Sequence, residues 1–104
     1  MKKPVAYKLS READQDLEEI FDYGEWHFGL DKAVSYLEKF DVLFAELVNY
    51  SELGRKHDEI KSGLRGFPLE SHIVFYRVLD DHVRILRVLH GSRYLTSFLD
   101  EPGF

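Results

Sequence analysis

The first half of the chain combines a short strand-like pattern with long helical spacings of apolar residues. Large apolar side chains at Val5, Tyr7 and Leu9 alternate with Ala6, Lys8 and Ser10, which predicts a half-buried strand. Ser10 can accept hydrogen bonds from the exposed N–H groups of a first helical turn, so we expect a helix to begin at about Arg11. Its apolar stripe comprises Ala13, Leu17, Ile20, Phe21, Gly24 and Phe28. Gly29 is expected to end this helix, and Asp31 to cap a second helix of about twenty residues.

The second half changes to a period of two, which favours strands. A period of two sets one group of residues, Ile60, Ser62 and Leu64, against Lys61, Gly63 and Arg65. Pro68 should close this strand because proline cannot donate to a ladder. Residues 72–79 and 83–90 are rich in β-branched and aromatic side chains. The Asp-Asp-His sequence at 80–82 fits a short turn, so the two segments should form an antiparallel hairpin.

These segments predict one α+β domain over residues 1–104. The expected order is strand, helix, helix and three strands (β-α-α-β-β-β), followed by a short C-terminal element with apolar residues at helical spacing over 93–99. Helices that are separated from a run of strands indicate an antiparallel sheet meander, packed on one face by the helical hairpin. The other face of the sheet would be open to a partner.

Composition narrows the classes of function. The 104 residues include no cysteine, which excludes disulfides, cysteine metal sites and thiol nucleophiles. The longest apolar runs have four residues, whereas a membrane-spanning helix needs about 18 or more. No signal-peptide pattern precedes the first helix. We therefore expect a cytoplasmic protein with no membrane partner.

Charge is divided unevenly along the chain. The 14 Lys and Arg residues against 19 Asp and Glu residues give a net charge of −5, whereas general nucleic-acid binders are expected to be basic. Residues 1–54 carry six basic and twelve acidic residues, and residues 55–104 carry eight and seven. An anionic partner is therefore expected to dock on the second half.

The sequence contains no recognisable catalytic or metal-binding motif. The five histidines are not at metal-ligand spacing and the serines form no nucleophile elbow, so no metal or other cofactor is expected. A cationic and partly aromatic group remains toward the C-terminus: Arg65, His72, Arg77, Arg84, Arg87, His90, Arg93 and Tyr94. This cationic group could bind phosphate or an acidic peptide, or its arginines could form ion pairs with acids of the first half of the chain.

Several short motifs follow one another in a characteristic order. In the first half they are Tyr7-Lys8-Leu9-Ser10, Ala13, Asp16-Leu17-Glu18-Glu19-Ile20, Phe28-Gly29, Ala33 and Tyr36-Leu37. In the second half they are Gly54-Arg55, Asp58-Glu59-Ile60, Gly63-Leu64-Arg65, the run from Ser71 to Arg77 and the run from Arg84 to His90. Over residues 7–93 this ordered set resembles the ParE branch of the RelE/ParE toxin superfamily.

The resemblance implies the toxin of a type II toxin–antitoxin pair, with a role in plasmid or chromosome maintenance and in stress response. It implies a ParD-like antitoxin that folds as it binds and assembles with the toxin in a hetero-oligomer. It also implies DNA gyrase as the target. Such a toxin is no enzyme: it traps gyrase on cleaved DNA and blocks replication, without sequence-specific nucleic-acid binding of its own.

Two groups of residues are candidates for these contacts. Three arginines are expected either to donate to acidic or backbone acceptors of the antitoxin or to hold the sheet together: Arg65, Arg77 and Arg87. Target contact is the expected role of His90, Arg93, Tyr94 and Phe98.

Two alternatives remain open at this point. The first is a ribosome-dependent mRNA interferase of the RelE type, with a catalytic set made of Arg65, Arg87, His90, Arg93 and Tyr94. The net charge of −5 argues against it, because it opposes docking on ribosomal RNA. The second is a chain that binds its antitoxin but is no longer toxic.

Overall fold

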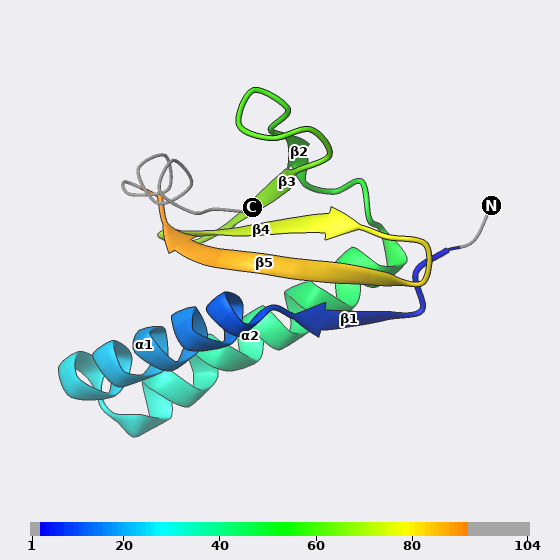
Figure 1. Cartoon of the computed structure of the whole chain (residues 1–104). Coiled ribbons are helices and arrows are strands. Elements are labelled where there is room, and N and C mark those ends of the chain that lie inside the picture. Colours follow the sequence, from blue (N-terminus) through cyan, green and yellow to red (C-terminus); the bar gives the residue numbers. More distant parts are fainter. Residues whose placement is uncertain (1–2, 92–104) are drawn as a thin grey trace.

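The computed structural model describes residues 3–91, in which two helices pack on one face of a five-stranded mixed sheet (Figure 1). The elements are β1 (Ala6–Leu9), α1 (Arg11–Phe28), α2 (Leu30–Asn49), β2 (Arg55–Lys56), β3 (Arg65–Leu69), β4 (His72–Val78) and β5 (His82–His90). The strands lie in the order β1-β5-β4-β3-β2, with β1 parallel to β5 and the other neighbours antiparallel. The predicted α+β class and element order are confirmed, and the short β2 is an additional edge strand.

The helical hairpin forms for reasons that are local in the sequence. Ser10 is the N-cap of α1, and its Oγ accepts a hydrogen bond of 2.9 Å from the N–H of Ala13. Gly29 ends α1 with a φ of 92°, a region that favours glycine. Gly29 is also the N-cap of α2, and no side chain caps that helix. The prediction that Asp31 caps α2 is therefore wrong, because a single glycine turns the chain and Asp31 already lies in the first helical turn.

The hydrophobic core lies between the helices and the inner face of the sheet, which is the face that they cover. Its largest fully buried side chains are Phe40, Phe44 and Leu47 of α2 and Val74, Tyr76, Val83 and Ile85 of the sheet. Burial of each such side chain contributes roughly 1.5–3 kcal/mol. Gly24 of α1 faces Ala33 of α2 where the two helices meet, and a Cβ at position 24 would lie in ordinary contact with the Cβ of Ala33, at 3.5 Å.

Residues 57–64 form a loop, and the prediction of a strand there is wrong. The loop closes through a hydrogen bond of 2.8 Å from the His57 N–H to the Leu64 carbonyl, and Gly63 adopts a φ of 83°. The loop packs against the outer face of the sheet. The apolar cluster on that face comprises Leu64, Phe75 and Leu89, with Ile60, Ile73 and Leu86 packed against it. The face that we expected to be open is therefore partly covered by the loop.

β3 begins only at Arg65 and continues through Pro68, so proline does not close it. Pro68 pairs with Ile73 of β4 on one side. On the other side β2 pairs only with Arg65 and Gly66, which leaves Pro68 at a free edge of the sheet. A missing N–H is tolerated at such an edge because no ladder partner needs it.

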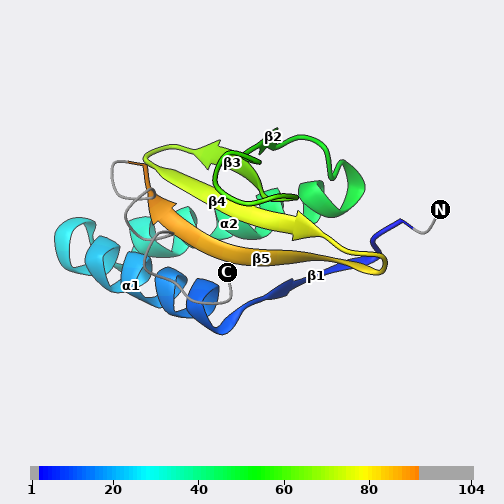
Figure 2. The same ribbon diagram turned by 45° about the horizontal axis from the view of Figure 1, so that its top comes forward.

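The predicted hairpin agrees with β4 and β5 to within one residue at each end, and Figure 2 shows the two strands side by side with β1 next to β5. β1 starts at Ala6, and Val5 before it is exposed. The C-terminal element predicted over residues 93–99 lies outside the described part of the chain. Within the described part, neither helix has the length and apolar character that a membrane span requires.

Candidate protein-binding groove

A groove of about 920 Å³ separates the helical hairpin from the end of the sheet where β5 stops. We call it the hairpin groove. Its apolar lining includes Ile20, Ala33, Val88 and Leu89. Its polar lining includes Asp16, Lys32, Tyr36, Glu70, His72, Arg87 and His90.

One wall of the hairpin groove holds an ion pair that joins α1 to β5. Asp16 is only 8% exposed, and its two oxygens accept hydrogen bonds from Arg87 Nε at 2.8 Å and Nη2 at 3.0 Å. The hydrogen bonding to Asp16 raises the pKa of Arg87, because it favours the charged guanidinium. This bidentate geometry is the strongest form of arginine–carboxylate contact.

The ion pair lies where the edge of β5 loses its neighbouring strand. β1 pairs with β5 only as far as Ile85. Beyond that point the Ser10 Oγ donates to the Leu86 carbonyl at 2.8 Å, and Asp16 accepts from the Val88 N–H at 2.9 Å. The N-cap and first turns of α1 therefore satisfy backbone groups of β5 that β1 does not reach.

Tyr36, His72 and His90 form a second polar cluster in the hairpin groove. The Tyr36 hydroxyl lies 2.8 Å from His72 Nδ1, and the two histidine rings are 5.6 Å apart. Burial lowers the pKa of His72, and the charge of His90 lowers it further. Burial also raises the pKa of the Tyr36 hydroxyl. At neutral pH His72 is thus a neutral hydrogen-bonding group, although the sequence placed it in a cationic cluster.

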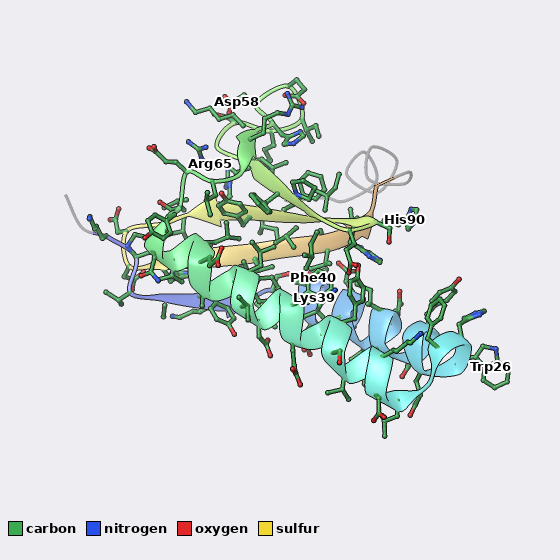
Figure 3. The ribbon with its side chains drawn as sticks, turned by 180° about the vertical axis from the view of Figure 1, so that it is seen from behind. Trp26, Lys39, Phe40, Asp58, Arg65 and His90 are labelled. Atoms are coloured by element: carbon green, nitrogen blue, oxygen red, sulfur yellow. The ribbon has the colours of Figure 1, made fainter. Side chains whose placement is uncertain are left out.

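The helical hairpin ends in an exposed apolar surface, which we call the aromatic tip: Tyr23, Trp26, Phe28 and Leu30. Figure 3 shows Trp26 at the far end of the hairpin, and 86% of this residue is exposed. Tyr23 and Phe28 also line the hairpin groove, so the tip and the groove adjoin. Exposed apolar surface next to a groove is typical of protein-binding sites.

The three arginines expected to bind an antitoxin lie in different environments. Arg65 Nη1 donates to the Gly54 carbonyl at 2.8 Å. Arg77 Nη2 donates to the Ser62 carbonyl at 2.6 Å. Only Arg87 lines the hairpin groove. Each of the three therefore stabilises a contact within the chain.

Of the residues assigned to the target, His90 lines the hairpin groove, whereas Arg93, Tyr94 and Phe98 lie outside the described residues. Figure 3 shows His90 and Arg65 at opposite ends of the sheet. The structure therefore does not bring together these two members of the set considered for mRNA cleavage. Within residues 3–91, no three His, Asp or Glu side chains are arranged so that they could hold a metal ion.

Sequence reasoning did not single out Asp16, Tyr23 or Tyr36 as site residues. For two of them, the position relative to the apolar stripe of α1 is a feature that sequence reasoning could have used. Asp16 is an acid next to the apolar stripe of α1, and Tyr23 is a large aromatic residue away from that stripe. Tyr36 lies on the apolar face of α2, where its hydroxyl gives no separate signal.

Comparison with known proteins assigns the family. Residues 7–95 match the sequence model described as "ParE toxin of type II toxin-antitoxin system, parDE". Toxin ParE1 of Caulobacter vibrioides is 35% identical over 86 residues, which span 83% of this chain and 88% of that protein. Toxin ParE1 of Mycobacterium tuberculosis is 38% identical over 87 residues, 81% of this chain and 87% of that protein. A chain of the chromosomal ParDE TA system from P. aeruginosa shares the fold, with a TM-score of 0.71 at 24% identity over 82% of this chain and 94% of that one. This chain belongs to the ParE family of toxins of type II toxin–antitoxin systems.

Proposed function

We propose that this ParE-family chain traps DNA gyrase on cleaved DNA, and that a ParD-like antitoxin neutralises it by direct binding in a hetero-oligomer. The match to the ParE family over residues 7–95 carries this proposal. The chain acts in the cytoplasm by binding, not by catalysis.

The hairpin groove is the proposed site for the antitoxin. Apolar walls beside an exposed aromatic tip suit an amphipathic segment that inserts side chains into the groove. Residues 11–49, which include both helices, carry eleven acidic and three basic side chains. We therefore expect the inserted antitoxin segment to carry Lys or Arg at its polar positions. A segment of this kind gains its structure as it binds.

A matched pair of tyrosine variants tests this site. Tyr23 lines the groove and is 62% exposed, whereas Tyr50 follows α2, is 67% exposed and does not line the groove. Tyr23→Ala should weaken binding of the cognate antitoxin by about tenfold or more in calorimetry, because buried tyrosines dominate binding energy at interfaces. Tyr50→Ala should change the affinity by less than about twofold. Equal affinities of the two variants would place the antitoxin elsewhere.

The target is tested by expression without antitoxin, followed by assays on purified gyrase. Thymidine incorporation should fall before methionine incorporation, and the purified chain should make gyrase accumulate linear, cleaved plasmid. A fall in protein synthesis before DNA synthesis would instead support the mRNA interferase. If neither falls, the chain is not toxic, as the second alternative expects.

We assign the gyrase contact to the end of β5 and the residues that follow, namely His90, Arg93, Tyr94 and Phe98. Because His90 also lines the hairpin groove, an antitoxin segment bound there would cover part of the target contact. Deletion of residues 93–104 should abolish killing while antitoxin affinity survives. Retained killing by the deletion variant would overturn this assignment.

A further inference from the structure

Three cations lie in register across the outer face of the sheet. Lys8 of β1 is the direct neighbour of Arg84 of β5, and Arg84 is the direct partner of Arg77 of β4. Figure 2 shows these three strands side by side. Adjacent strands are about 4.8 Å apart, so the three side chains leave the backbone within about 10 Å. We call this group the outer cationic row.

The alternation of side chains along the strands places the row on the outer face. The residues on either side of Lys8 and Arg84 contribute to the inner core: Tyr7, Leu9, Val83 and Ile85. Because successive side chains point to opposite faces, Lys8 and Arg84 project outward. Arg77 shares that face as the direct partner of Arg84, and its guanidinium reaches the loop that covers part of it.

No acid in the described part of the chain forms an ion pair with the row, although the charge of Lys8 acts on Asp81 and lowers its pKa. Among residues 3–91, neither Lys8 nor Arg84 forms an ion pair, and Arg77 donates only to a neutral carbonyl. The nearby Asp81 is held by His82 at 2.8 Å, and that bond lowers the pKa of Asp81 more than the charge of Lys8 does. Like charges directly opposite on a sheet are destabilising. Such a local cost is typical of a functional surface.

The surroundings of the row favour a polypeptide ligand over nucleic acid. The next outward side chains along β5 and β4 are apolar. Leu86 and Ile73 are half-buried and lie at the margin of the apolar cluster on the outer face. A segment that crosses the face therefore meets both cations and apolar side chains, which suits carboxylates interspersed with apolar residues. Nucleic acid offers repeated phosphates, and the net charge of −5 repels it.

We propose that an acidic segment of the antitoxin binds across the outer cationic row, at a site separate from the hairpin groove. This inference rests on the antitoxin binding proposed above. The two sites then require opposite charges in one partner: a basic amphipathic segment for the acidic helical hairpin and an acidic segment for the sheet. The row would contribute affinity and fix which segment lies on which face.

Arg84→Glu tests the proposal because it should move stability and binding in opposite directions. The substitution makes the charges alternate across the row, so the melting temperature of the free chain should rise by about 3 °C. Affinity for the cognate antitoxin should fall by about tenfold or more, and its dependence on salt should weaken. Arg55→Glu is the control, because it makes the same charge change on β2 at the opposite edge of the sheet. It should alter the affinity by less than about twofold.

Each other result is informative. If Arg84→Glu and Arg55→Glu both bind the antitoxin like the unchanged chain, the proposal is wrong, while a loss by Tyr23→Ala would still support the hairpin groove. If the unchanged chain does not bind the antitoxin, the proposed function fails and this inference fails with it. If Arg84→Glu keeps its antitoxin affinity but loses binding to a fluorescent DNA duplex, the row recognises phosphate and the proposal is overturned. Arg84→Gln repeats the affinity test with a smaller change of charge.

Discussion

Arg84 and Arg87 lie three residues apart on β5, yet their surroundings are opposite. Arg84 is exposed between two other cations, Lys8 and Arg77. The Arg87 side chain is only 15% exposed and is held by both oxygens of Asp16. One arginine is therefore available to a partner, while the other joins a helix to the sheet. A count of cations in the sequence cannot separate these two roles.

A bulge in β5 and a change of neighbour between the two arginines account for the difference. Ile85 pairs with Tyr76 of β4, and Arg87 pairs with Phe75, so Leu86 is an extra residue without a partner. Before the bulge, β1 lies along the edge of β5. After the bulge, the start of α1 takes over that edge. The element at the edge thus decides whether an arginine of this strand is a surface charge or a structural one.

The largest effect is expected from Arg87→Ala, because it leaves the buried Asp16 carboxylate without its cation. The free energy of unfolding, measured by urea titration, should fall by about 3–5 kcal/mol. Arg87→Lys should lose less, because the charge remains while the bidentate geometry is lost. Arg84→Ala is the control and should change stability by no more than about 0.5 kcal/mol. Equal losses at positions 84 and 87 would contradict the contrast between the two arginines.

A smaller loss is expected from Ser10→Ala at the same seam between α1 and β5. The hydroxyl accepts from the Ala13 N–H and donates to the Leu86 carbonyl, so its removal takes away both a helix cap and a bond to the strand edge. The free energy of unfolding should fall by about 1–2 kcal/mol in the same urea titration. Ser35→Ala, at an exposed position of α2, should change it by less than about 0.5 kcal/mol. If both serine variants unfold at the same urea concentration, Ser10 does not hold the seam.

The helix boundaries and the contacts of α1 with β5 differ in how far the sequence predicts them. The boundaries of the helical hairpin depend on Ser10 and Gly29, which lie next to the turns that they set, so a local pattern was sufficient. The bond from Ser10 to Leu86 spans 76 positions, and the ion pair of Asp16 with Arg87 spans 71. No local pattern specifies such partners, and the parallel pairing of β1 with β5 is hidden for the same reason.

In the second half of the chain, the loop over residues 57–64 and the arginines likewise have partners that no local sequence pattern specifies. Ile60 and Leu64 are spaced like strand residues, but they cover the outer face of the sheet from a loop, and their spacing alone does not distinguish the two cases. Arg65 and Arg77 were recognised as candidate cations. Their acceptors are backbone carbonyls, which any residue type presents, so the sequence contains no sign of them.

The smallest effect concerns His72, where burial, not a carboxylate partner, decides the charge. Burial and the charge of His90 lower the pKa of folded His72, and Asp16 and Glu70 oppose this without overcoming it. The unfolded chain, in which histidine has its ordinary pKa of about 6.5, then binds the proton more tightly. The contribution of His72 to stability is complete above that pKa and is lost as the pH falls toward the lower pKa of the folded chain.

Urea titrations at about pH 7.5 and about pH 5 isolate this contribution, since other groups titrate in every variant. The free energy of unfolding should fall less over this range in His72→Gln than in the unchanged chain, and the glutamine can still face the Tyr36 hydroxyl. His90→Gln should lie between them, because it removes the charge that adds to the effect of burial. Parallel behaviour of His72→Gln and the unchanged chain would show that the pKa of His72 is the same in the folded and unfolded chains, and that burial does not decide its charge.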